Sequence, residues 1–215
     1  MSLLPGLEQM AGAHALMIMG VVPEGAAPMP EGLRTLVLLG PREPGFWAHF
    51  SKCPEFLDAM PDPMDRWSRR VIGAIAGAMG ARAMFPFGTA PAHPFITWAL
   101  ASGRAFVSPV HLLVHDQAGL WVSYRGALGL AERLEPLPPS RNPCAECSRP
   151  CLTACPAGAL TQAGYDLPSC HGYLDSAEGV SCLTGGCAVR AVCPLSRAHG
   201  RAPAQSAHHM RHFHP

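Results

Sequence analysis

Eight of the nine cysteines in this 215-residue chain fall in one stretch, between Cys144 and Cys193. A secretory signal requires a basic residue near its start, but no lysine or arginine precedes Arg34. No apolar run is long enough to span a bilayer. We therefore expect a cytoplasmic protein with reduced cysteines. Closely spaced cysteines in a reducing compartment are more often metal ligands than disulfides. This stretch is expected to fold around metal, which limits what the chain as a whole can form.

The first four cysteines follow the spacing Cys-x2-Cys-x3-Cys-x3-Cys-Pro, over residues 144–156. Bacterial ferredoxins bind [4Fe–4S] clusters through a Cys-x2-Cys-x2-Cys-x3-Cys-Pro run, whose fourth cysteine ligates the other cluster in two-cluster proteins. The second gap is one residue longer here, and a loop can absorb that residue. A looser second run ends in the same way, at Cys193-Pro194. The spacing is therefore typical of a two-cluster ferredoxin.

Eight cysteines are the number that two four-thiolate clusters require. The repeated Cys-Pro ending predicts that the last cysteine of each run crosses to the other cluster. The ligands of the first cluster are then Cys144, Cys147, Cys151 and Cys193, and those of the second are Cys155, Cys170, Cys182 and Cys187. Two zinc sites with four thiolates each would use the same residues. Zinc sites usually have paired Cys-x2-Cys motifs well apart in sequence, so the compact run favours iron–sulfur.

The residues before the cysteine stretch predict a mixed α/β core. Short apolar runs at 15–22 and 33–40 have the length of strands. Residues 63–79 have the apolar period of an amphipathic helix, which Asp62 can cap and Gly80 can end. We also expect a strand at 81–87 and a helix ending at Gly103.

Residues 110–130 predict a β-hairpin, because two strand-like runs flank the sequence Asp-Gln-Ala-Gly. Gly119 can take the positive φ that a tight turn requires.

Four segments follow from these patterns: an N-terminal α/β domain (1–134), a proline-rich linker (135–143), an iron–sulfur module (144–198) and a histidine-rich tail (199–215). A net charge of +1 gives no reason to expect nucleic acid or a membrane surface as a partner. His208 and His212 stand four residues apart and can share a metal on a helix. At the end of the chain, a solvated or docked tail is the favoured alternative.

The cysteine stretch resembles the double-cluster ferredoxin-like module of the epoxyqueuosine reductase family. The segments CLTACPAGALT, CHGYLD and GCAVRAVCP each resemble a part of that module. Arg190 stands about where the closing motif has a cysteine, and Cys182 would take the place of that ligand. The resemblance implies an α+β protein whose C-terminal ferredoxin-like module holds two [4Fe–4S] clusters. The family's acidic proton donor has no equivalent near residues 85–94, so epoxyqueuosine reduction itself is not implied.

Residues 119–130, GLWVSYRGALGL, are similar to a strand shared by epoxyqueuosine reductases and cobalamin-processing proteins of the decyanase type. Both have a nitroreductase-like α/β domain that accepts cobalamin, which implies a related N-terminal domain here. Cofactor pockets of this kind are apolar with a few placed polar groups. The residues expected to contact a cobalamin or a flavin are Trp98, Trp121, Tyr124 and Arg125.

These patterns predict an iron–sulfur electron-transfer protein, either a redox enzyme or its accessory protein, that works with a redox partner protein. The chain has no Rossmann fingerprint and no P-loop, so the sequence does not support nicotinamide chemistry or nucleotide hydrolysis. The alternative is a non-enzymatic protein in which zinc or a cluster organises an interaction or sensing module. A brown protein that fades on dithionite reduction would favour the first interpretation, and a colourless protein with stoichiometric zinc would favour the alternative.

Overall fold

The structure, a computed structural model, describes residues 3–215 and is a mixed α/β protein. The chain divides into two compact units. Unit 1 contains the residues up to Arg104 together with Ser123–Ser140, and unit 2 contains Ala105–Val122 together with Arg141–Pro215. The predicted linker (135–143) is divided between the units after Ser140, and the predicted tail (199–215) is part of unit 2. Ala105–Val122, which was expected in the N-terminal domain, also belongs to unit 2. Apolar residues of that segment pack with apolar residues of the cysteine stretch, which explains the interleaved arrangement.

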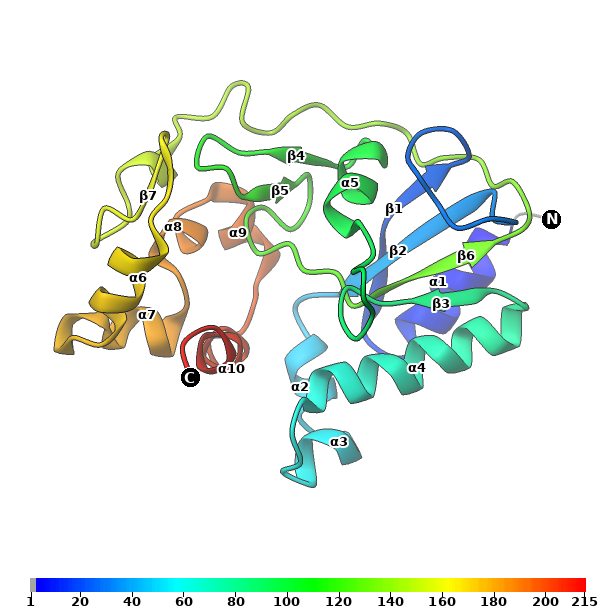
Figure 1. Ribbon diagram of the computed structural model, residues 1–215, viewed down its shortest axis with the longest axis horizontal. Helices are drawn as coiled ribbons and strands as arrows, with labels where there is room; N and C mark the ends of the chain where they lie inside the picture. Colours follow the sequence, from blue (N-terminus) through cyan, green and yellow to red (C-terminus); the bar gives the residue numbers. More distant parts are fainter. Residues whose placement is uncertain (1–2) are drawn as a thin grey trace. The chain divides into compact units, whose positions relative to one another are not determined.

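Unit 1 is built around one antiparallel sheet (Figure 1). Its elements, in chain order, are α1 (Leu4–Gly12), β1 (Leu16–Pro23), β2 (Thr35–Pro41), α2 (Phe46–Phe50), α3 (Pro54–Leu57), α4 (Pro63–Met79), β3 (Arg82–Met84), α5 (Phe95–Ala101) and β6 (Gly126–Leu130). The strand order in the sheet is β1-β2-β6-β3, and each neighbouring pair is antiparallel. Apolar side chains of α1 and α4 form one core with those of the sheet.

The strongest sequence patterns of unit 1 are confirmed. Both apolar runs form strands, and every residue of β2 is buried. The long helix α4 begins at Pro63 and ends before Gly80, whose backbone is left-handed with φ 63°. The predicted cap at Asp62 is wrong, since its side chain makes no cap hydrogen bond. Its backbone is left-handed, with φ 50°, whereas a capping side chain reaches the first turn from an extended backbone.

The predicted hairpin over residues 110–130 is also wrong. Its first strand, β5 (Leu113–His115), pairs with β4 (Ala105–Val107) in unit 2, whereas β6 lies between β2 and β3 in unit 1. All five residues of β6 are buried, as in a central strand. A side chain at Gly126 would meet Ile72 and the backbone of Met84, so glycine lets α4 and β3 approach closely. Pairing with two neighbours buries β6 more completely than a hairpin would.

Unit 2 consists of short elements, many of them helical (Figure 1). Besides β4 and β5 they are η1 (Pro150–Leu152), β7 (Leu160–Thr161), β8 (Gly164–Tyr165), α6 (Leu167–Leu174), η2 (Ala177–Gly179), α7 (Val180–Gly185), α8 (Ala188–Ala191), α9 (Pro194–His199) and α10 (Pro203–Phe213). β4 and β5 form one antiparallel pair, and β7 and β8 form another. The core is small, and cysteines are part of it.

The histidine-rich end of the chain forms α10, which packs against α7. Gln205, Ser206 and His208 of this helix are buried. His212 Nδ1 lies 2.8 Å from the carbonyl oxygen of His208, one turn away. The tail is therefore a packed part of unit 2, in agreement with the expected alternative of a docked tail.

Gly119 adopts the predicted turn conformation, with φ 56°. Its amide and carbonyl each bond with those of His115, and a Cβ at this position would lie 2.4 Å from the amide nitrogen of Ser196. We expect Gly119→Ala to destabilise unit 2 by more than the about 1–2 kcal/mol that a left-handed backbone costs an L-residue. Gly158→Ala is the matched control, because Gly158 has φ 61° but open space around it. Equal melting temperatures for the two variants would contradict the contact argument.

In the described part of the chain, no helix is both long enough and apolar enough to cross a membrane.

Candidate metal centre

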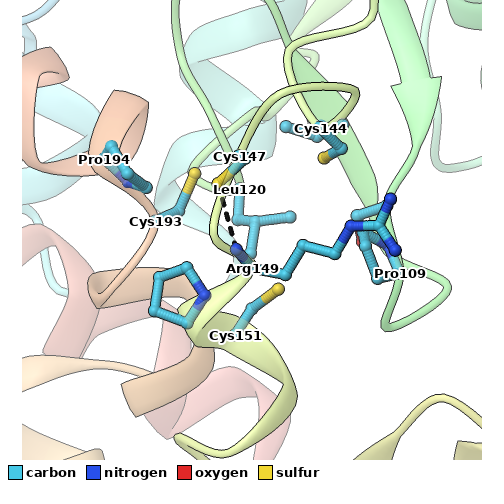
Figure 2. A pocket seen from close by; sticks show the side chains of 11 residues that line it. Pro109, Leu120, Cys144, Cys147, Arg149, Cys151, Cys193 and Pro194 are labelled. Atoms are coloured by element: carbon cyan, nitrogen blue, oxygen red, sulfur yellow. Dashed lines mark hydrogen bonds between the residues drawn. The ribbon is translucent and has the colours of Figure 1, made fainter.

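Four of the predicted ligands line one pocket of unit 2: Cys144, Cys147, Cys151 and Cys193. Figure 2 shows their sulfur atoms around a common space. The first three lie on the loop around η1, and the fourth immediately precedes α9. The set that the repeated Cys-Pro ending predicts is therefore brought together, although its last member lies far along the chain.

The loop that carries the first three cysteines is shaped by local hydrogen bonds. The amide of Cys144 donates to Asn142 Oδ1 at 2.9 Å. The amide of Arg149 donates to Cys147 Sγ at 3.4 Å, the bond drawn in Figure 2. Arg149 itself is left-handed, with φ 56°, just before η1. This left-handed turn lies in the gap that is one residue longer than in ferredoxins, and it directs the chain back toward the pocket.

The pocket is an unfavourable place for thiolates without a cation. Burial raises the pKa of the Cys144 thiol, and the neighbouring thiols of Cys147, Cys151 and Cys193 raise it further. Burial likewise raises the pKa of the Cys151 thiol. The thiolate forms of Cys144 and Cys151 are therefore disfavoured when no cation is bound, and metal binding would have to displace the protons of these two thiols.

Within residues 3–215, no group of three or more His, Cys, Asp or Glu side chains is placed to hold a single metal ion. A cluster makes a different demand on its ligands. Each of the four thiolates binds a different iron at its own corner of the cluster, so the sulfurs surround a space instead of meeting at one point.

The second predicted set is also partly assembled in unit 2. Cys170 lies on α6, Cys182 lies on α7 and Cys187 immediately precedes α8. The hydroxyl of Tyr165 donates to Cys170 Sγ at 3.3 Å. Burial raises the pKa of Tyr165, and the nearby thiols of Cys170 and Cys187 raise it further. Tyr165 is therefore bonded to Cys170 and lies near Cys187, and no sequence motif marked it.

Arg190, which stands about where the resembled motif has a cysteine, is half-buried near Cys187 of this second set. Its guanidinium donates to the carbonyl of Leu120 at 2.6 Å. Burial lowers the pKa of Arg190, while Cys187 and Tyr165 act in the opposite direction. Burial raises the pKa of the Cys187 thiol, and the Arg190 cation acts in the opposite direction, toward the thiolate form that binds metal.

Cys155, the remaining predicted ligand of the second set, accepts a hydrogen bond from the amide of Ala159 at 3.2 Å. It packs at the margin of the apolar cluster that Cys187 also joins. Its place in a site with Cys170 and Cys182 stays a prediction.

The residues predicted to contact a cobalamin or a flavin belong to different units. Trp98 and Arg125 lie in unit 1 and Trp121 lies in unit 2. The indole nitrogen of Trp98 donates to the carbonyl of Pro28 at 2.7 Å. Arg125 is buried and bonds to Asp65 at 3.2 Å. The indole nitrogen of Trp98 and one terminal nitrogen of Arg125 are thus engaged within unit 1, whereas Arg125 Nε is buried without a hydrogen-bond partner in the described residues.

The other two residues of this set also contact neighbours in their own units. Tyr124 lies in unit 1, where its ring is 6.4 Å from that of Phe95. The guanidinium of Arg201 lies over the ring of Trp121 in unit 2, with its Cζ atom 4.9 Å from the ring centroid. A cofactor role for the four residues stays a prediction.

No protein-family model matches the chain, and no curated protein or solved structure is detectably similar to it.

Proposed function

We propose that this protein is an iron–sulfur electron-transfer protein whose unit 2 holds two [4Fe–4S] clusters. One observation carries the proposal: three cysteines of a ferredoxin-like run and one cysteine from a distant run line the same pocket. Cys144, Cys147, Cys151 and Cys193 would hold the first cluster. Cys155 and the three cysteines on or beside α6, α7 and α8 would hold the second.

The chain's own residues supply the surroundings that an electron carrier needs. Val114, Leu120 and Pro150 line the cysteine pocket and keep its dielectric low. The amide of Arg149 donates to a ligand sulfur, and such bonds stabilise added negative charge. When bound, a cluster supplies reversible one-electron chemistry. Burial and hydrogen bonding by the protein then set the potential at which the electron is exchanged.

The finer parts of the proposal rest on the resemblance to epoxyqueuosine reductases and cobalamin-processing proteins. Unit 2 would be a ferredoxin-like module, and unit 1 would be a shortened nitroreductase-like domain that accepts a corrinoid or a flavin. A redox partner protein would exchange electrons with the clusters. The protein would act as a redox enzyme or as its accessory protein in the cytoplasm.

Reversible reduction tests the electron-transfer function. Anaerobically purified protein should be brown, with broad absorption near about 400 nm that fades with dithionite and returns on reoxidation. A colourless protein that contains zinc would contradict the proposal and would favour a metal-organised interaction or sensing module. Anaerobic titration with cobalamins and flavins tests the role of unit 1. No spectral change and no binding heat with either class would leave unit 1 without a cofactor.

A further inference from the structure

Ser108 lines the cysteine pocket but was not among the predicted site residues. It lies just after β4, where its amide donates to the carbonyl of Leu112 at 2.9 Å and its carbonyl accepts from the amide of His111 at 3.0 Å. These bonds fix the backbone of Ser108 in a tight turn. Ser108 is 4% exposed, so surrounding groups hold its side chain against the pocket.

The hydroxyl of Ser108 is buried without a hydrogen-bond partner anywhere in residues 3–215. Leaving a buried hydroxyl unpaired costs about 1–3 kcal/mol. The side chains of Pro109, Val114 and Leu120, which also line the pocket, offer no acceptor. The remaining lining groups include the four cysteines. A ligand rich in negatively charged sulfur, bound between those cysteines, would supply the missing acceptor.

We propose that the Ser108 hydroxyl donates a hydrogen bond to a sulfur atom of the cluster held by Cys144, Cys147, Cys151 and Cys193, and thereby raises the reduction potential of that cluster. The inference rests on the proposed function. Reduction adds one electron to the cluster without forming or breaking a covalent bond. A hydrogen bond to a sulfur is stronger when the cluster carries more negative charge, so it stabilises the reduced state more than the oxidised state.

The test compares Ser108→Thr with Ser108→Val. The two side chains have nearly the same shape, but threonine keeps the hydroxyl that valine replaces with a methyl group. The two clusters are followed separately by anaerobic redox titration with electron paramagnetic resonance. In the valine variant, we expect the ratio of reduced to oxidised first cluster at a fixed potential to be about tenfold lower than in the wild-type protein. Tenfold corresponds to a potential about 59 mV lower for a one-electron couple. The threonine variant should stay near the wild-type value, and the second cluster should not move in either variant.

Ser196→Ala controls for packing, because Ser196 is a buried serine of the same unit whose hydroxyl accepts from the amide of Leu120 at 2.9 Å. This hydroxyl already has its partner, so removing it should lower stability and leave the potential unchanged. Equal potentials for the two Ser108 variants, with the cluster intact, would overturn the inference and leave the proposed function standing. An equal shift in Ser196→Ala would also overturn it, since packing would then explain both. Absence of iron from the wild-type protein would overturn the inference and the proposed function together.

Discussion

Cys193→Ala is expected to remove the cluster of the pocket formed with Cys144, Cys147 and Cys151, and to spare the second cluster. The reason is geometric, because Cys193 lines that pocket although it belongs to the second run of cysteines. The variant should lose about four of about eight iron atoms, with a matching loss of labile sulfide. Electron paramagnetic resonance of the reduced protein should show the same signal missing as in Cys144→Ala.

Cys53→Ala is the matched control for this experiment. Cys53 is a half-buried cysteine of unit 1 that packs against the apolar core and lies in neither predicted ligand set. Its removal should leave the iron content unchanged. Full iron content in Cys193→Ala would contradict the predicted ligand set. Loss of the same cluster in Cys144→Ala and Cys155→Ala would rule out the crossing of the fourth cysteine, because the crossing assigns Cys155 to the other cluster.

Removal of metal is expected to unfold unit 2 and to leave unit 1 folded. The core of unit 1 contains the fully buried Trp67, Phe46 and Phe50 and includes none of the eight predicted ligand cysteines. The core of unit 2 is small, and Cys151 is one of its buried members. Metal binding can supply a large part of the folding free energy of such a module, about 10–16 kcal/mol for structural zinc in small peptides.

Limited proteolysis with mass spectrometry measures this difference. After chelation or oxidative loss of metal, early cleavage sites should fall within residues 105–122 and 141–215, whereas the segments of unit 1 should resist. The peptides of unit 1 serve as the internal control within each digest. Equal resistance of unit 2 with and without metal would show that its core folds on apolar contacts alone.

The sequence was sufficient to predict the elements whose burial pattern is strong and local. β1 and β2 are continuous apolar runs, and α4 combines a helical period with Pro63 at its start and Gly80 at its end. The apolar pattern that predicts each of these elements lies within one short segment of the chain. The prediction therefore does not depend on which distant residues pack against that segment.

Features that depend on distant partners were not predictable in this way. β6 looked like half of a hairpin, but β2 and β3 pair with it on both sides. Residues 105–122 carry no cysteine and yet belong to the cysteine-rich unit. Ser108 lines the cysteine pocket only because of that placement, and no motif marks it. The cysteines stood out because ligation of a cluster would constrain their spacing directly, and their role as ligands stays a prediction.

Metal and sulfide analysis of anaerobically prepared protein tests the central claim most directly, because it separates iron–sulfur clusters from zinc and from metal-free thiols. Two [4Fe–4S] clusters predict about eight iron atoms and about eight labile sulfides per chain, with little zinc. A protein that contains zinc without labile sulfide, or no metal at all, would contradict the account.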